Sequence, residues 1–186
     1  MNSSFFRFTC LGTLLFLSSE LLAQNLPTAK ESLDVTAFGG FTYLSPDYGQ
    51  YNDHGFLFGA DVGRPFHKFL GSIDGRYTHA TGDGVSETTF LGGPKIAIRR
   101  RRFEPYADLL VGYGTITFTH PTSAYTGDNS IVFAFGGGLN YNLWRNLSVK
   151  GDLTYQYWKL GDANAYLTPV AISAGLAYRI PISRRH

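Results

Sequence analysis

The stretch that decides the fold is residues 147–158, which reads LSVKGDLTYQYW. Its side chains alternate in character. One face carries Leu147, Val149, Gly151, Leu153, Tyr155 and Tyr157, and the other carries Ser148, Lys150, Asp152, Thr154, Gln156 and Trp158. Successive side chains of a β-strand point to opposite faces, so a period of two residues predicts a strand whose faces meet different environments.

The same alternation recurs along the chain, and no stretch shows a convincing helical period. Apolar residues such as Phe56, Phe58 and Val62 stand on one parity, and polar residues such as Asp61 stand on the other. Eight strands are therefore expected, at residues 33–44, 55–64, 69–79, 88–99, 105–118, 130–142, 147–158 and 169–180.

The connections between these strands alternate in length. Longer links at 45–54, 80–87, 119–129 and 159–168 are rich in turn-forming residues, and shorter links lie at 65–68, 100–104 and 143–146. An even number of strands with short turns at one end and longer loops at the other is typical of outer-membrane barrels. The pattern predicts an all-β, eight-stranded antiparallel up-and-down transmembrane β-barrel over residues 33–182.

Composition limits the alternatives. The 186 residues are 44% hydrophobic and 16% aromatic, but only 16% are charged, which excludes a disordered chain. The single cysteine, Cys10, cannot form an internal disulfide. A net charge of +2 gives no indication of nucleic-acid binding.

The first residues resemble a secretory signal. Arg7 supplies a positive charge, residues 8–17 form a short apolar run, and Ala23 precedes a plausible cleavage point. The run is shorter than the ~20 residues of a membrane-spanning helix. We expect residues 1–23 to be a cleaved signal peptide, 24–32 to be a lead-in, and the protein to be exported through the periplasm to the cell outer membrane.

Ten charged residues lie well inside the expected strands, all on the polar face and five of each sign. They are Asp34, Asp61, Asp74, Arg76, Lys95, Arg99, Asp108, Lys150, Asp152 and Arg179. Because buried charges must be paired, this balance predicts an ion-paired network that fills the lumen of a closed barrel. Removing one partner, as in Asp74→Ala or Lys95→Ala, is expected to cost on the order of 3–5 kcal/mol.

Alternation does not say which face points inward, so a soluble lipocalin-like carrier with an apolar interior stays open. Aromatic residues favour the membrane barrel because they gather near strand ends on the apolar face, as interfacial belts do. Tyr43, Phe56, Tyr77, Phe90 and Tyr157 lie toward the longer loops, and Phe69, Tyr141 and Tyr178 lie toward the short turns.

Three segments carry a resemblance to a known family. They are Phe90–Lys95 followed by Glu104–Ala107, Phe133–Tyr157 with its Gly136-Gly137-Gly138 run, and Ile172–Ile180. The chain resembles the small outer-membrane β-barrels of the OmpA and opacity type from Gram-negative bacteria. The resemblance implies contact with outer-membrane lipid and lipopolysaccharide, and insertion by the barrel-assembly machinery. Residues 181–186 follow the position where family members usually end, and the peptidoglycan-binding domain of OmpA is not matched, so cell-wall anchoring is not expected.

Sites of chemistry are few. A lipid-A-acting enzyme would need a nucleophile, a histidine and a carboxylate at the outer rim, where His79, His120, Ser86, Ser123, Asp83 and Glu87 fall without a recognisable motif. No catalytic, cofactor or metal site is expected.

The glycine run is interpreted as small residues inside a narrow barrel. Pro94 predicts a bulge near Gly92-Gly93-Pro94, and the basic run 99–102 predicts a solvated cap touching anionic lipid.

The expected function is that of a non-enzymatic, porin-like outer-membrane barrel. We expect a monomer with a structural or adhesin-like role, whose loops 46–54, 80–87, 119–129 and 159–168 contact lipopolysaccharide, other cells or an unknown extracellular ligand. A small passive pore and a lipid-A-acting enzyme stay open as alternatives.

Overall fold

The computed structural model describes residues 33–45, 52–82, 84–118, 127–159 and 166–181. They belong to one compact unit, Ser32–His186. The expected signal peptide and lead-in lie outside the described residues, as does Ile182. No helix in the described ranges is long and apolar enough to cross a membrane.

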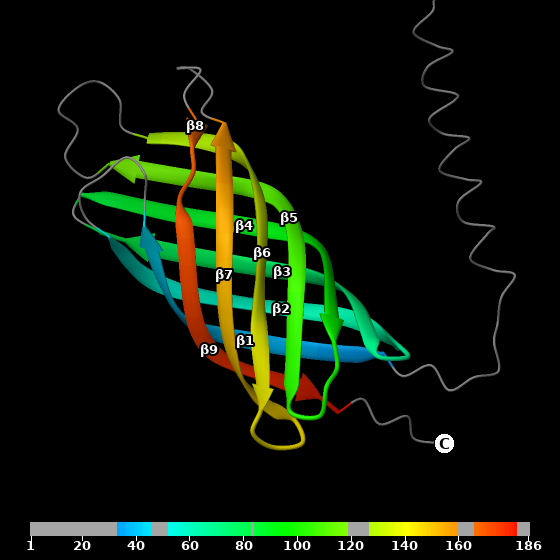
Figure 1. The fold of residues 1–186 in the computed structure, drawn as a ribbon. Coiled ribbons are helices and arrows are strands. Elements are labelled where there is room, and N and C mark those ends of the chain that lie inside the picture. The colour runs from blue at the N-terminus through cyan, green and yellow to red at the C-terminus, as the bar shows by residue number, and fades with distance from the viewer. Residues whose placement is uncertain (1–32, 46–51, 83, 119–126, 160–165, 182–186) are drawn as a thin grey trace, which may run out of the picture. The chain divides into compact units, whose positions relative to one another are not determined.

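Eight long antiparallel strands form one sheet that closes on itself (Figure 1). Each strand pairs with the next along the chain, and β9 closes the barrel by pairing with both β7 and β1. The strands are β1 (Asp34–Ser45), β2 (Asp53–Phe66), β3 (Phe69–Thr81), β4 (Val85–Ile98), β5 (Phe103–Phe118), β6 (Gly127–Asn142), β7 (Leu147–Lys159) and β9 (Val170–Ile180). The predicted eight-stranded antiparallel barrel is confirmed.

The strand ends differ from the prediction at the end that carries the longer links, which we call the loop end. Here β3 and β4 extend until residues 82–84 alone connect them, and the Gly82 amide donates to the Val85 carbonyl at 2.9 Å. A two-residue strand, β8 (Tyr166–Leu167), also pairs with the end of β7. The apolar alternation fades before these strand ends, so the pattern alone placed them in loops.

The opposite end, which we call the turn end, carries short connections at residues 67–68, 99–102 and 143–146. The pairing of Val35 with Ile180 places the start of β1 and the end of β9 at this end as well. Backbone hydrogen bonds tie these turns to their neighbours. The Arg99 amide donates to the Lys68 carbonyl of the next turn at 2.8 Å, and the Arg179 amide of β9 donates to the Asn146 carbonyl at 2.8 Å.

The predicted bulge at Gly92-Gly93-Pro94 is absent. Gly92 pairs with Val111 and Lys95 with Asp108, so two residues separate these pairs on each strand and none is inserted. Instead, the pairing of β4 with β5 is interrupted, while Pro94 still pairs with Ile73 of β3. Because proline has no N–H, it removes a ladder hydrogen bond without requiring an extra residue.

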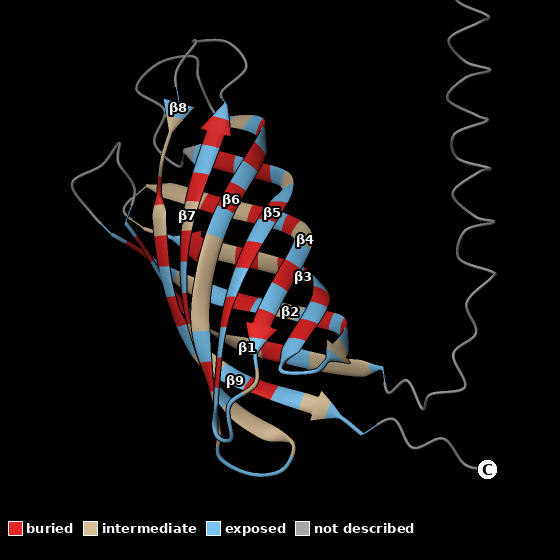
Figure 2. Ribbon diagram, turned by 45° about the vertical axis from the view of Figure 1, so that its right-hand side comes forward, coloured by how far each residue is buried: buried red, intermediate tan, exposed pale blue. Residues whose placement is uncertain are grey.

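Burial alternates along the strands, as the buried and exposed bands of Figure 2 show. Apolar side chains of the regular alternation face out: Phe133, Leu153 and Ile172 are 56%, 54% and 56% exposed. Polar and charged side chains face in, with Asp74 at 0% and Lys150 at 3% exposure. The barrel is therefore apolar outside and carries its buried charges inside, whereas a lipocalin is polar outside and apolar inside.

Candidate functional site

The most distinctive chemistry of the molecule lies in its lumen. All ten charged residues predicted for the lumen face inward, and each forms an ion pair with another described residue. With one further carboxylate, Glu104, they form two groups. The central ionic cluster comprises Asp61, Asp74, Arg76, Lys95, Asp108, Lys150 and Asp152, and the turn-end ionic cluster comprises Asp34, Arg99, Glu104 and Arg179.

Arg76 is the hub of the central ionic cluster. Its guanidinium contacts Asp74, Asp108 and Asp152 at 3.1, 2.7 and 3.2 Å, and its side chain is 3% exposed. Arginine suits this position because its planar fork presents five N–H donors and stays charged. Three strands on different sides of the lumen, β3, β5 and β7, are thereby joined through one side chain.

Two lysines complete the central ionic cluster. The Lys95 ammonium lies 2.6 Å from Asp61 and 3.8 Å from Asp74, and that of Lys150 lies 3.4 Å from Asp152. Four carboxylates thus face three cations. The Tyr106 hydroxyl donates a hydrogen bond of 2.5 Å to Asp152 and accepts one from Lys150.

Aromatic rings pack among these charges. The Lys150 ammonium lies 3.9 Å from the centroid of the Tyr106 ring and 4.7 Å from that of Phe38, which is within the range of cation–π attraction. Glycines make room for both rings. A Cβ added at Gly59 would lie 2.4 Å from the Phe38 ring, and one added at Gly138 would lie 2.5 Å from the Tyr106 hydroxyl.

The turn-end ionic cluster includes one residue that the alternation did not identify. Glu104 is 5% exposed and accepts from Arg99, Arg179 and Asn140 at 3.4, 3.2 and 3.2 Å. Asp34 pairs with Arg99. Glu104 was assigned to the 100–104 turn, whereas β5 begins at Phe103 and makes Glu104 an inward position. Extending the predicted strand 105–118 by one residue would have placed Glu104 on the same face as Tyr106 and Asp108.

Beyond the central cluster, toward the loop end, a group of apolar side chains packs inside the lumen. This loop-end apolar cluster comprises Leu91, Leu110, Ile116, Val132, Ala134 and Trp158, with Val85 and Leu167 packed against it. Trp158 is 1% exposed, and its indole N–H donates to the Gln156 side chain at 2.9 Å. Buried polar side chains, among them Glu87 at 3% and Thr89 at 2% exposure, share this end of the lumen, so ionic, polar and apolar side chains together fill the interior.

Little free volume is left between these layers. A cavity of about 10 Å³ is lined by residues that include Thr42, Arg76, Asp152 and Gln156. This is about the volume that one water requires. The packing matches the expectation that an eight-stranded barrel is just wide enough for its own side chains.

The candidate catalytic residues are not assembled. His120, Ser123 and Asp83 lie outside the described residues. His79 and Ser86 face outward while Glu87 faces inward, so the barrel wall separates Glu87 from the other two. The His79 imidazole contacts the hydroxyls of Thr88 and Thr81 at 2.9 and 3.4 Å. Among the described residues, no group of His, Cys, Asp and Glu side chains is arranged to hold a metal ion.

Comparison with solved structures places this architecture among known proteins. Neisserial surface protein A matches with a TM-score of 0.54 and 15% identity, and Ail, the attachment invasion locus protein of Yersinia pestis, with 0.54 and 17%; each match covers 82% of this chain and all of the other. The fold is that of the small outer-membrane barrels. A major outer membrane protein from Thermus thermophilus matches with a TM-score of 0.51 and 14% identity, over 78% of this chain and 99% of the other.

At these identities the similarity establishes the fold. No protein-family model and no curated protein sequence matches the chain.

Proposed function

We propose that this protein is a non-enzymatic β-barrel of the outer membrane, with a closed lumen and a surface-interaction role at its loop end. The observation that carries the proposal is the division of the barrel wall into an apolar outer face and an ion-paired inner face. An outer face rich in Phe, Leu and Ile suits acyl chains. In water it would be a large exposed apolar surface, which monomeric soluble proteins rarely carry.

Aromatic side chains support a membrane position. At the loop end, outward rings form a continuous row, with centroids 6.3 Å apart between Phe56 and Tyr77 and 4.7 Å apart between Tyr77 and Phe90. At the turn end, the rings of Phe103 and Tyr141 are 5.1 Å apart. Two aromatic zones at opposite ends of an apolar belt are characteristic of membrane barrels. Lipid and lipopolysaccharide are the partners that we propose for this belt and its loop-end rim.

The surface role is proposed from the structural similarity to other outer-membrane barrels. The loop end would face outward in the arrangement of outer-membrane barrels, whose short turns lie in the periplasm. The two structures that share the fold at a TM-score of 0.54 are named a surface protein and an attachment invasion locus protein. We propose that the protein is a monomer, because closure of the sheet leaves no unpaired edge among the eight long strands. We also propose that the barrel-assembly machinery inserts it.

The location is tested by membrane fractionation followed by gel electrophoresis with and without boiling. We expect the protein in the outer-membrane fraction, with a change of mobility on boiling, because a folded barrel migrates differently from its unfolded chain. A soluble carrier would instead be recovered in the soluble periplasmic fraction and would bind an apolar ligand. Recovery there, with no heat-dependent mobility, would contradict the proposal.

A passive pore is the second candidate, and planar-bilayer recording separates it from a closed barrel. We expect no steady, large conductance, because ionic and apolar side chains fill the lumen and the cavity beside Arg76 holds about 10 Å³. A large porin inserted into the same bilayer provides the positive control. Steady current from the purified protein under those conditions would favour the pore.

A further inference from the structure

Two neighbouring turns at the turn end form a fixed surface. In the β4–β5 turn, the amides of Arg100 and Phe103 donate to each other's carbonyls at 2.9 and 2.7 Å. The Asn142 amide donates to the Arg102 carbonyl at 2.8 Å, which ties this turn to the end of β6 and hence to the β6–β7 turn. The two turns are therefore held side by side by the backbone.

This surface is strongly basic. Arg100, Arg101, Arg102 and Arg145 all lie on it, and none forms an ion pair with a carboxylate in the described part of the chain. The nearby carboxylates do not neutralise these arginines. Asp34 and Glu104 point into the lumen, where Arg99 and Arg179 already pair with them. The predicted basic cap thus divides: Arg99 faces inward, and the three arginines after it are free to meet an anion.

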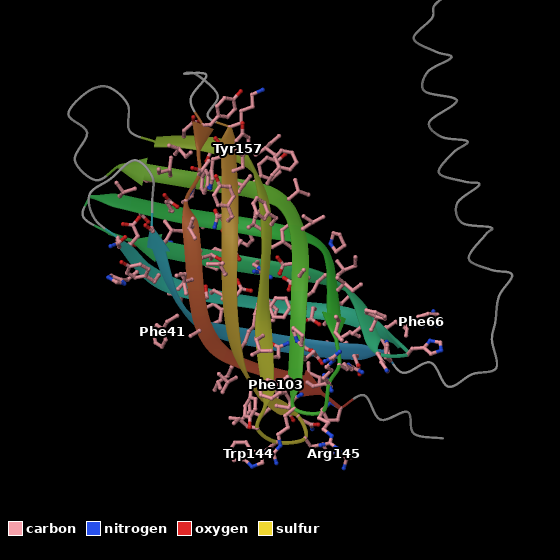
Figure 3. The ribbon with its side chains drawn as sticks, in the orientation of Figure 1. Phe41, Phe66, Phe103, Trp144, Arg145 and Tyr157 are labelled. Carbon is pink, nitrogen blue, oxygen red and sulfur yellow. The ribbon has the colours of Figure 1, made fainter. Side chains whose placement is uncertain are left out.

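Apolar side chains stand beside these arginines. Trp144 is 71% exposed and lies just after β6, next to Arg145 in the turn, and Phe103 is 51% exposed. Figure 3 shows Phe103, Trp144 and Arg145 together at this end of the barrel. We call this surface the turn-end basic patch: Arg100, Arg101, Arg102, Phe103, Tyr141, Trp144 and Arg145.

We propose that the turn-end basic patch binds the headgroups of anionic glycerophospholipids in the adjacent leaflet. The patch is continuous with the apolar outer face through Phe103 and Tyr141, so a lipid beside the barrel places its phosphate at the level of the arginines. Guanidinium groups bind phosphate through paired hydrogen bonds. Tryptophan and tyrosine prefer the headgroup region, where basic residues attract anionic lipid.

This inference rests on the proposed membrane location, and one experiment separates the two. The chain has two tryptophans, of which Trp158 is sealed in the lumen and Trp144 lies in the patch. The barrel is folded into phosphatidylcholine vesicles that contain a fixed fraction of a brominated lipid, which quenches tryptophan within contact distance. Either phosphatidylglycerol or phosphatidylcholine carries the bromine, and a Trp158→Phe variant checks that Trp144 is the reporter.

We expect the quenching of Trp144 by brominated phosphatidylglycerol to correspond to a local fraction of this lipid about threefold or more above its bulk fraction. The reason is that each arginine near an anionic surface contributes a factor of roughly five in affinity. High salt and the R101Q/R102Q/R145Q variant should both reduce the enrichment toward one. Lys159→Gln is the matched control, because it removes an exposed charge at the other end of β7.

The outcomes are distinct. Equal quenching by the two brominated lipids overturns the headgroup site and leaves the membrane location intact. No quenching by either lipid contradicts the location itself. Enrichment that persists in the triple variant, or that Lys159→Gln abolishes equally, would show that the patch is not the binding surface.

Discussion

Replacing Arg76 by methionine is expected to lower the free energy of unfolding by at least about 3–5 kcal/mol, the cost of breaking a buried ion pair from one side. The substitution keeps an unbranched side chain but removes the group that contacts Asp74, Asp108 and Asp152 together. Lys95 and Lys150 would then face all four carboxylates of the central ionic cluster. The effect should exceed that of removing Lys95 or Asp74. Urea titration of the barrel in lipid vesicles, followed by gel mobility, measures it.

Two further variants show whether charge or packing causes the loss. Adding Asp108→Asn and Asp152→Asn to Arg76→Met leaves two carboxylates facing two lysines and should recover a large part of the stability. Arg179→Met is the matched control. The Arg179 side chain is 32% exposed and shares Glu104 with Arg99, so we expect it to cost no more than ~1 kcal/mol. Equal losses for Arg76→Met and Arg179→Met would contradict the central role of Arg76.

The sequence allowed the barrel, its strand number and its lumen charges to be predicted for one physical reason. A strand between lipid-like and ionic surroundings must alternate, and the alternation of residues 147–158 is nearly unbroken. The charged residues indicated which of the two faces of each strand points into the barrel. Arg76, Lys95 and three aspartates had to find partners, and only a closed interior brings strands β2, β3, β4, β5 and β7 within reach of one another.

The loop-end apolar cluster could not be predicted in this way. Leu109, Leu110 and Val111 are apolar on both faces of their strand, as are Ile131, Val132 and Phe133, so periodicity does not separate the inward residue from its neighbours. Leu110 is identified as inward by its parity with Asp108, and Val132 by its pairing with Trp158, which shares the parity of Lys150 and Asp152. The strands also continue past the apolar belt, which is why polar Glu87 was placed in a loop.

Which charged residue contacts which partner also could not be predicted from one sequence. Balance of charge predicted that the ten residues pair, but not that Arg76 contacts three carboxylates while Lys150 lies against the rings of Tyr106 and Phe38. Those contacts depend on the stagger between distant strands, which sets the height of each side chain in the lumen. Glycines at positions 59 and 138 then allow the two rings to lie there.

Leu153→Arg is expected to destabilise the barrel in lipid vesicles by about 2–4 kcal/mol, as an arginine near the bilayer midplane does. Leu153 lies at the middle of β7, faces outward, and pairs with Gly137 and Ile172 of the strands on either side. Its side chain points away from the lumen that holds the central ionic cluster, so the cost reports on the outer environment. Unfolding in urea, again followed by gel mobility in vesicles, gives the free energy.

Val149→Arg is the control that makes this measurement decisive. Val149 lies on the same face of β7 but near the turn end, where an arginine reaches the headgroups and costs about 0–1 kcal/mol. A depth-dependent difference between the two variants requires a bilayer around the belt. If the outer face met water instead, both substitutions would fall within about 0.5 kcal/mol of the parent, as ordinary surface substitutions do. That result would contradict the proposed membrane location and, with it, the proposed lipid site at the turn end.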